Sequence, residues 1–297
     1  MKIYTIIVTY NGLQWMDFCL GSLRASTVQT TPIIIDNNSS DKTVEYIRAN
    51  YPECVILDNN KNLGFGRANN MGLSYALKNN ADYVLLLNQD AAIAPNMLEL
   101  CLSQSDGKSL LSPIHMNGDG TRVDNSFRYN SLVKCDAFIN DIITGNIKNS
   151  YHCGEICAAC WLLPISILQS VGGFSPLFFQ YCEDNNYYNR LIYHGIKTIL
   201  VPNARVYHDR LDFGNEAVYN QQWLYGVLLL NFTNLNTTSS QKIWECLRIL
   251  WQCYRTKLPQ KKYNIGAYLY SIVKLLANTK TIKYYRSIEK HTNSSHL

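Results

Sequence analysis

The chain lacks any apolar run near the roughly 18 residues that span a bilayer, because Asn or Gln interrupts the longest stretches, such as 223–230. It also lacks a small-residue cleavage site after residues 3–8, its first apolar stretch, which favours a strand over a signal peptide. We therefore expect a cytoplasmic protein. Peripheral contact with the inner face of the membrane is compatible with this expectation.

Two phosphate-binding fingerprints are missing as well. No glycine-rich loop ends in Gly-Lys-Ser or Gly-Lys-Thr, which excludes a P-loop enzyme. Gly64 and Gly66 start a dinucleotide-like pattern, but Asn69 stands where its third glycine would fall. That departure disfavours a Rossmann dehydrogenase. No recognisable nucleic-acid-binding module occurs either, so we expect no nucleic-acid partner.

The ten cysteines form no recognisable framework. Cys157 and Cys160 have a redox-like or zinc-like spacing, but no second pair follows at zinc-ribbon distance and their neighbours are apolar. We interpret the cysteines as mostly small buried hydrophobic residues.

The net charge of +5 is unevenly distributed. Eleven basic residues against two acidic ones lie between Lys242 and Lys290, so this stretch carries +9 and the rest of the chain −4. The positive charge therefore belongs to the C-terminal part of the chain.

In its first ninety residues the sequence alternates between strand and helix patterns. Strands are predicted over 3–8, 32–36, 54–57 and 83–87, and helices over 13–23, 41–50 and 62–79. This alternation is typical of a doubly wound α/β sheet with parallel strands, whose ligands bind at the carboxyl ends of the strands.

The next segment reads as mixed and partly antiparallel. Strand-like stretches are 110–113, 122–128, 133–143, 158–163, 196–201 and 204–208, with helices at 164–173 and 184–195. Beyond residue 215 the pattern is helical. We expect a main α/β domain over 1–214 and a helical, basic extension over 215–297.

The strand at 83–87 ends in Asn88-Gln89-Asp90, a polar tip after a buried-looking run. Oxygen ligands of this kind suit Mg²⁺ or Mn²⁺ bridging a diphosphate, so we predict a metal site at Asp90. His208 ends another predicted strand and is either a second ligand or a surface histidine. The alternative for the tip is an ordinary Asx turn.

Glu183 and Asp184 begin a helix after an aromatic stretch. A general base fits here, but so does a plain helix N-terminus, where carboxylates are favoured by about 0.3 to 1 kcal/mol. Trp161, Phe179 and Tyr181 could form the apolar wall of a binding site, although such residues are more often core.

Polar residues at other strand ends could hold a nucleotide. Asp36 could accept hydrogen bonds from ribose hydroxyls, or could simply form a turn. The backbone amides of the helix entry at Gly64 could approach phosphate oxygens. The predicted nucleotide-binding residues are Thr9, Tyr10, Asn11, Asp36, Asn38, Gly64, Asn69, Asn88 and Gln89.

Taken in order, these motifs resemble the family 2 glycosyltransferases of the GT-A fold, including bacterial rhamnosyltransferase-like members. The resemblance covers about residues 2–208. It is carried by Ile-Ile-Val-Thr-Tyr-Asn-Gly (6–12), Asp-Asn-Asn-Ser-Ser-Asp (36–41), Asn-Leu-Gly-Phe-Gly-Arg-Ala-Asn-Asn-Met-Gly (62–72), Leu-Leu-Leu-Asn-Gln-Asp (85–90), Val-Gly-Gly-Phe (171–174) and Tyr-Cys-Glu-Asp (181–184).

The resemblance implies a three-layer α/β/α fold with a mostly parallel sheet, and inverting transfer of a sugar from a nucleoside diphosphate, here dTDP or UDP, to a hydroxyl. It implies that Thr9, Tyr10, Asp36 and Asn69 line the nucleotide pocket. By the same resemblance Asp90 holds Mg²⁺ or Mn²⁺, His208 completes the metal shell as in some GT-A enzymes, and Asp184 is the base. For such a reaction Trp161, Phe179 and Tyr181 are the predicted apolar walls for the acceptor sugar.

Two positions depart from the family pattern. Asn88 replaces the first Asp of the Asp-x-Asp motif, which implies weaker metal affinity. Asn185 and Asn186 follow the acidic pair where an acidic residue is commoner, so the group that supports the pair is missing from its usual place.

The extension is not covered by the resemblance. Aromatic and aliphatic faces beside Lys and Arg, as in 223–232, 243–254 and 265–276, fit a membrane-surface helix set, a helical cap or a homodimer interface. If these helices bind a membrane surface, we expect the acceptor to be a lipid-linked glycan. Two other functions stay open at this point: a sugar-phosphate nucleotidyltransferase, and a non-catalytic carbohydrate-binding or nucleotide-sugar-binding protein on the same fold.

Overall fold

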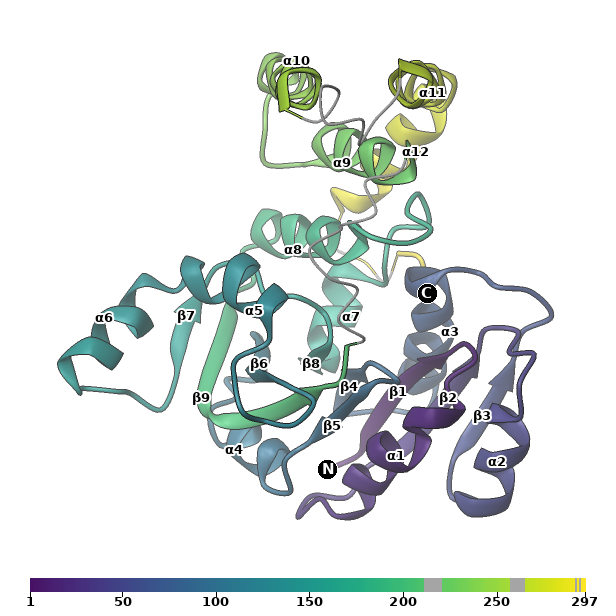
Figure 1. The fold of residues 1–297 in the computed structure, drawn as a ribbon, viewed down its shortest axis with the longest axis vertical. Helices are drawn as coiled ribbons and strands as arrows, with labels where there is room; N and C mark the ends of the chain where they lie inside the picture. The colour runs from purple at the N-terminus through teal and green to yellow at the C-terminus, as the bar shows by residue number, and fades with distance from the viewer. Residues whose placement is uncertain (211–220, 257–264, 292, 294) are drawn as a thin grey trace.

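The computed structural model describes residues 1–210, 221–256, 265–291, 293 and 295–297. Its centre is a single sheet in the order β3-β2-β1-β4-β8-β6-β9-β5, with β7 paired to β9 (Figure 1). The strands are β1 Ile3–Thr9, β2 Thr31–Asp36, β3 Val55–Asp58, β4 Tyr83–Leu87, β5 Ala91–Ile93, β6 Leu110–Asn117, β7 Tyr151–Cys153, β8 Cys160–Pro164 and β9 Thr198–His208.

The first half of the sheet is parallel and the second half is mixed. Strands β3, β2, β1 and β4 run in the same direction, and β8 is antiparallel to β4. β6 and β9 are parallel to each other, and the short strands β5 and β7 are antiparallel to β9. The predicted α/β class with a largely parallel sheet is confirmed.

Helices cover both faces of this sheet, which makes three layers. They are α1 Met16–Arg24, α2 Thr43–Asn50, α3 Phe65–Lys78, α4 Met97–Ser103, α7 Ile165–Val171 and α8 Glu183–Tyr193. Alternate residues of β1 point to opposite faces, as the pleat requires. Ile7 packs in the cluster with α1 and α4, and Ile6 in the cluster with α3, α7 and α8. The strands are therefore buried on both sides, as their apolar runs predict.

Two predicted strands are wrong. The stretches 122–128 and 133–143 fold as α5 Asn125–Asn130 and α6 Asp136–Thr144, apart from their flanking residues. The Asp124 carboxylate caps α5 by accepting the backbone N–H of Phe127 at 2.8 Å, a start signal that outweighs β propensity. The stretches 196–201 and 204–208 form one continuous strand, β9, whose pairing with β6 shifts register between Pro113 and Ile114.

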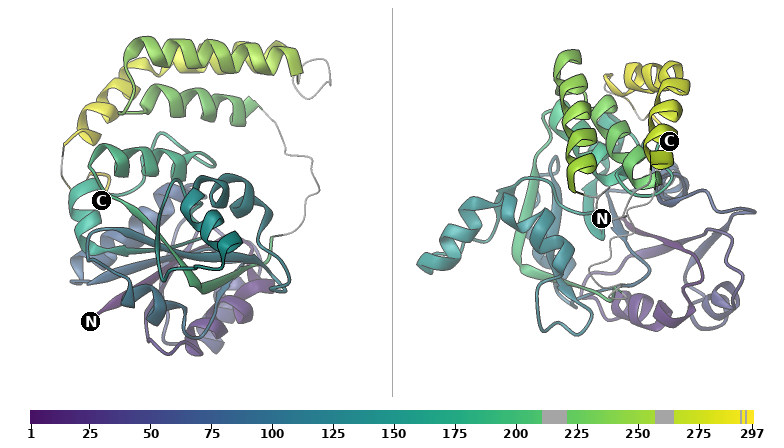
Figure 2. Two further views of the ribbon diagram at one scale, coloured as in Figure 1. Left: turned by 90° about the vertical axis from the view of Figure 1, so that its left-hand side faces the viewer. Right: turned by 45° about the horizontal axis from the view of Figure 1, so that its top comes forward.

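Among the described residues of the C-terminal part, the helices above α8 are α9 Gln221–Thr233, α10 Ser239–Thr256, α11 Ile265–Ala277 and α12 Thr279–Glu289. α9 lies between α8 and the outer pair α10 and α11, as the left view of Figure 2 shows. Within the described ranges, none of the helices is long and apolar enough to cross a membrane. The predicted division at 214/215 stays a prediction.

The last residues return to the α/β part. Ser295 accepts the backbone N–H of Gly173 at 2.8 Å, and His296 contacts the buried Glu289 carboxylate at 3.1 Å. Arg190, buried in α8, donates to the carbonyl of Gly173 at 2.5 Å and adds its charge to this cluster. The C-terminal helices are thus tied to α8 through buried charged groups.

Candidate active site at the strand ends

The tips of β1 and β4 are joined by one side chain. Gln89 accepts hydrogen bonds from the Thr9 hydroxyl at 2.8 Å and from the backbone N–H of Tyr10 at 3.0 Å. Tyr10 leaves its ring about half exposed at this edge. The structure brings these three predicted residues together, and an exposed aromatic ring there can stack on a base.

Asp36 ends β2 directly beside Thr9. One carboxylate oxygen accepts the backbone N–H of Ser39 at 3.0 Å. The other, Oδ1, is buried and has no hydrogen-bond partner among the described residues. A buried acceptor without a partner costs about 1 to 3 kcal/mol, so this oxygen is ready for a donor such as a ribose hydroxyl.

Asn11 and Asn38 shape the neighbouring loops. Both have positive φ, 49° and 71°, the left-handed region that Asn tolerates. The amide oxygen of Asn11 accepts the backbone N–H of Ser40 at 2.8 Å, so this group already serves the loop. The Asn38 side chain is exposed.

Gly64 precedes α3 at φ 79°. A Cβ at this position would collide with the carbonyl oxygen of Phe179, which accepts the backbone N–H of Phe65 at 3.2 Å. The glycine therefore brings the aromatic loop 178–182 against the start of α3. Asn69 lies inside the helix, is 2% exposed and donates to the Phe65 carbonyl, so its amide serves its own helix.

Asp90 and His208 face each other across the ends of β4 and β9. Asp90 Oδ1 lies 3.1 Å from His208 Nε2, and the amide of Asn88 lies 3.4 Å from the same nitrogen. Arg210 donates from Nε to His208 Nδ1 at 3.1 Å and lies 3.4 Å from Asp124. Sequence reasoning missed Arg210 and Asp124.

This pair fits a divalent cation only in part. Asp90 directly precedes β5, whose first residue, Ala91, pairs with His208 of β9. The two residues supply a carboxylate and an imidazole, a donor set used for such ions. The buried Asn88 Oδ1 has no partner in the described structure and adds a possible oxygen donor. No group of three or more His, Cys, Asp or Glu side chains suited to a metal occurs within the described residues. A bound ion would need ligands from the donor.

The acidic pair begins α8 in a buried setting. Burial, together with the charge of the adjacent Asp184 as a smaller cause, raises the pKa of Glu183 to about 8. Glu183 Oε2 has no partner within the described ranges. Burial also raises the pKa of Asp184, although its carboxylate accepts the backbone N–H of Asn185 at 2.9 Å. A carboxylate with a raised pKa is a stronger base than an ordinary one.

The segment before β8 connects the Asn88-Gln89-Asp90 tip with the acidic pair at the start of α8. The backbone N–H of Asn88 donates to the carbonyl of Ala159 at 3.0 Å. The backbone N–H of the preceding residue, Ala158, hydrogen-bonds to the Asp184 carboxylate. The Asn88-Gln89-Asp90 tip and the start of α8 therefore meet at two consecutive residues, although about ninety positions separate them in the sequence.

Glu155, which sequence reasoning also missed, stands beside the acidic pair. It accepts a hydrogen bond from the side chain of Asn185 and pairs with Lys134 at 2.5 Å. Its negative charge adds to burial in raising the pKa of Asp184. Asn185, one of the two positions that depart from the family pattern, thus brings in an acidic group from another loop.

The three aromatic residues predicted for the acceptor have different positions. Phe179 and Tyr181 are 53% and 64% exposed, next to the acidic pair. Tyr181 and Cys182 both have φ of 68°, a conformation that costs energy in non-glycine residues and often marks functional loops. Trp161 is 1% exposed in the core, stacked on Phe174, a position that favours packing over acceptor contact.

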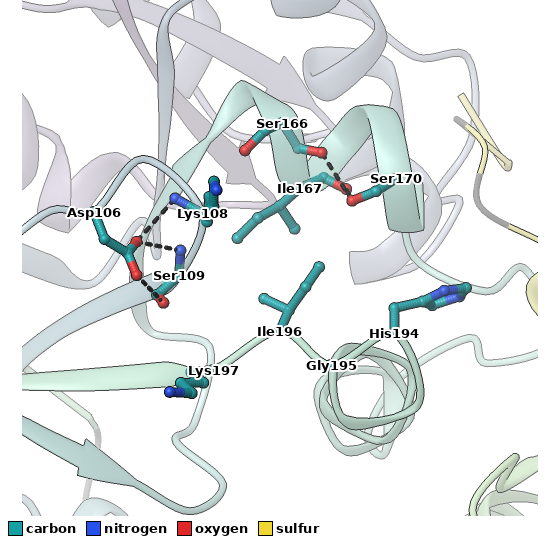
Figure 3. Close-up of a pocket in the computed structure, with 10 residues that line it drawn as sticks. All are labelled: Asp106, Lys108, Ser109, Ser166, Ile167, Ser170, His194, Gly195, Ile196 and Lys197. Atoms are coloured by element: carbon teal, nitrogen blue, oxygen red, sulfur yellow. Dashed lines mark hydrogen bonds between the residues drawn. The ribbon is translucent and has the colours of Figure 1, made fainter.

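A cavity of about 450 Å³ in the described structure lies away from this site. It lies where β6 and β9 begin, at the opposite edge of the sheet, and none of the predicted residues lines it (Figure 3). Asp106 at its rim is occupied by the backbone N–H groups of Lys108 and Ser109, 2.9 and 2.7 Å away. Its polar groups largely serve the surrounding loops.

Comparisons with known proteins agree with the motifs and the fold. The N-acetylglucosaminyl-diphospho-decaprenol L-rhamnosyltransferase of Mycobacterium tuberculosis is 25% identical over 230 residues, 69% of this chain and 75% of that protein. The dTDP-rhamnosyl transferase RfbF of Shigella flexneri is 19% identical over 212 residues, 70% of this chain and 69% of that protein. Both are similar over most of their length.

Solved structures show the same fold. S. aureus TarS in complex with UDP-GlcNAc has a TM-score of 0.63 at 14% identity, covering 98% of this chain and 91% of that one. The mannosyltransferase PcManGT from Pyrobaculum calidifontis, in complex with GDP-Man and Mn²⁺, has a TM-score of 0.59 at 12% identity, covering 97% and 84%. These structures establish the GT-A fold for this chain.

The family model described as glycosyl transferase family 2 matches residues 4–169, more than half of the chain. Nothing in the comparisons favours a nucleotidyltransferase or a non-catalytic binding protein. The predicted resemblance is confirmed: this chain belongs to glycosyl transferase family 2, on its rhamnosyltransferase-like branch, and acts in glycan biosynthesis.

Proposed function

We propose that the protein transfers a sugar from a dTDP-sugar or UDP-sugar to a hydroxyl of a glycan or lipid-linked glycan, with inversion at the anomeric carbon. One observation carries the proposal. The Asn88-Gln89-Asp90 tip and Asp184 meet at the Ala158-Ala159 segment, which would let a donor diphosphate and an attacking hydroxyl share one site. Its place in bacterial surface polysaccharide synthesis follows from the same proposal.

In this proposal Asp184 removes the proton of the acceptor hydroxyl as that oxygen attacks the anomeric carbon. Its raised pKa suits this role, and proton transfer by a positioned group contributes a factor of about 10² to 10⁴. Attack from the face opposite the departing diphosphate inverts the configuration. The adjacent carboxyl group of Glu183 is buried.

The donor would lie along the ends of β1, β2 and β4. Asp36 Oδ1, which lacks a partner among the described residues, would accept a hydrogen bond from a ribose hydroxyl. The exposed ring of Tyr10 would stack on the base. Asp90 and His208 would hold Mg²⁺ or Mn²⁺. When bound, the ion would neutralise charge that develops on the diphosphate.

The acceptor side is proposed at the aromatic loop. Phe179 and Tyr181 expose their rings next to Glu183-Asp184, where they could pack on a sugar ring. A lipid-linked acceptor implies that the protein works in the cytoplasm at the inner face of the membrane, touching it through the C-terminal helices.

The first test is a thermal-shift panel of nucleotide sugars with and without Mn²⁺, followed by assays for release of the nucleoside diphosphate. We expect dTDP-sugars or UDP-sugars to raise the melting temperature, and more strongly with Mn²⁺. Shifts only with GDP-sugars or CMP-sugars would contradict the proposed donor. No shift with any nucleotide sugar would contradict the proposed function.

A further inference from the structure

Helices α10 and α11 carry an apolar surface that no described residue covers. On α10 the exposed side chains fall on one stripe, and α11 repeats the pattern at spacings of three and four residues. Their exposed fractions run from 36% for Ile272 to 68% for Trp244 and Leu276. We call this surface the outer face; it comprises Ile243, Trp244, Leu247, Trp251 and Tyr254 of α10 with Leu269, Ile272, Val273 and Leu276 of α11.

The opposite sides of these helices are buried. Cys246 of α10 and Leu275 of α11 pack with Leu228 of α9 in one apolar cluster. Each helix therefore already has a packed inner face, and the outer face is additional apolar surface. Exposed apolar surface of this extent marks sites of contact with a partner or a membrane.

The same apolar cluster ties the outer face to the acidic pair. It includes Phe178 and Cys182, and Cys182 directly precedes Glu183. α10 and α11 form the edge of the molecule farthest from the sheet, with α9 and then α8 beneath them (Figures 1 and 2). Whatever binds the outer face is held above the aromatic loop and the proposed base.

Charge indicates which partner fits. The stretch 242–290 carries +9 while the rest of the chain carries −4. Arg248 and Arg255 lie on α10 itself, and Lys280, Lys283 and Arg286 follow on α12. Exposed Trp and Tyr among Leu and Ile, flanked by Lys and Arg, are the composition of helices that lie in a membrane interface. A polyanionic surface with an apolar interior complements both properties.

We propose that the outer face of α10 and α11 binds the surface of a membrane rich in anionic phospholipid, with the helices lying parallel to the bilayer. Trp244 and Trp251 would enter the headgroup region while Arg248 and Arg255 contact lipid phosphates. The chain would then present the start of α8 to an acceptor anchored in that membrane; this last step rests on the proposed function.

A second copy of the chain fits the outer face less well. In a two-fold dimer the same patch meets itself, so Arg248 and Arg255 of both copies would be brought to one interface. Like charges near an apolar contact oppose association, whereas anionic headgroups favour it. Anionic lipid is therefore the occupant that the charges select.

The test is sedimentation of the full chain with vesicles of phosphatidylcholine alone or with phosphatidylglycerol. We expect at least about tenfold stronger binding to the anionic vesicles, and at least about a tenfold loss for the double variant Trp244→Ser with Trp251→Ser. The fluorescence of the wild type should shift to shorter wavelength on binding, and the double variant should lose most of that shift.

A matched control places serine on another exposed apolar site. Tyr129 and Ile143, 64% and 80% exposed on α5 and α6, are as accessible as the two tryptophans. Tyr129→Ser with Ile143→Ser should bind vesicles like the wild type. Equal losses in both double variants would overturn the proposal, as would equal binding to neutral and anionic vesicles.

Light scattering of the protein without vesicles measures its oligomeric state and so tests the remaining alternative, a homodimer formed through the outer face. We expect a monomer in the wild type and in the double variant. A dimer that the tryptophan variant dissociates, without anionic vesicle binding, would assign the outer face to a second copy and overturn the proposal. Because vesicle binding needs no sugar donor, its failure is distinguishable from failure of the proposed glycosyl transfer.

Discussion

The two acidic ends of the candidate site differ in their surroundings. At the end of β4, the Asp90 side chain is 23% exposed and has His208 as a partner at 3.1 Å. At the start of α8, Glu183 is 8% exposed, and its Oε2 has no partner among the described residues. Asp90 thus lies in a polar, partly hydrated setting, whereas Glu183 lies in a largely desolvated one.

This difference separates the proposed roles. A partly exposed carboxylate beside an imidazole suits a site that gathers a cation and a charged diphosphate. A desolvated carboxyl pair suits proton transfer, because burial raises its pKa toward the working range of a base. Environments that differ in this way distinguish two carboxyl groups in one site.

Replacing the proposed base should have the largest effect. We expect Asp184→Asn to lower the transfer rate by about 10² to 10⁴, because the acceptor proton loses its receiver. Donor affinity, measured by calorimetry with the nucleoside diphosphate, should stay near the wild-type value. Asp58→Asn, at the exposed end of β3, is the matched control and should transfer normally. A normal rate in Asp184→Asn would remove it from the reaction.

Replacing Asp90, the carboxylate at the end of β4, should weaken donor binding. We expect Asp90→Asn to weaken binding of the nucleoside diphosphate in Mn²⁺ by about 10- to 100-fold, the usual scale for a disturbed metal site. Without Mn²⁺ the variant and the wild type should bind alike. Calorimetry under both conditions measures this, and an equal loss with and without the ion would contradict the metal role.

Glu183→Gln should change stability rather than donor binding. The folded-state pKa of Glu183, about 8, exceeds its ordinary value of 4.5, so the folded protein holds more protons between these values. Its contribution to stability is present at low pH and is lost as pH rises through this window. At about pH 9 the Gln variant should be more stable by about 1 to 3 kcal/mol, and at about pH 4 nearly equal. Urea unfolding at both pH values tests this; a variant less stable at high pH would contradict it.

The smallest effect is expected from Glu155→Gln. Burial and the charge of Glu155 both raise the pKa of Asp184, so removing that charge should lower it. The acid limb of the transfer rate should then move to lower pH. A pH profile measures the shift, with Glu53→Gln, on the surface and paired to Arg24 at 2.6 Å, as the control. A move to higher pH would contradict the assignment of Asp184.

The alternation of strands and helices up to residue 90 could be predicted because period and turn residues agree there. Residues 122–143 could not, because Phe127 and Phe138 are buried by helices whose signals, the Asp124 cap and Gly145, are short and local. The strand-end residues followed from the parallel sheet, which brings Thr9, Asp36 and Gln89 to one edge.

The remaining site residues depend on contacts between distant segments. Glu155 contacts the acidic pair by accepting a hydrogen bond from Asn185, and Arg210 donates one to His208. No sequence pattern indicates either contact. Trp161 is an aromatic residue of the kind that can line an acceptor site. The antiparallel pairing of β8 with β4 instead places its side chain in the core. Residue type alone does not distinguish these positions.

The most direct test of the central claim is the configuration of the product. A nucleotide sugar identified in the thermal-shift panel is incubated with acceptor, and the anomeric proton of the transferred sugar is observed by NMR. The account predicts an anomeric configuration opposite to that of the donor, formed by the wild type and lost together with the rate in Asp184→Asn. A product with retained configuration would contradict it.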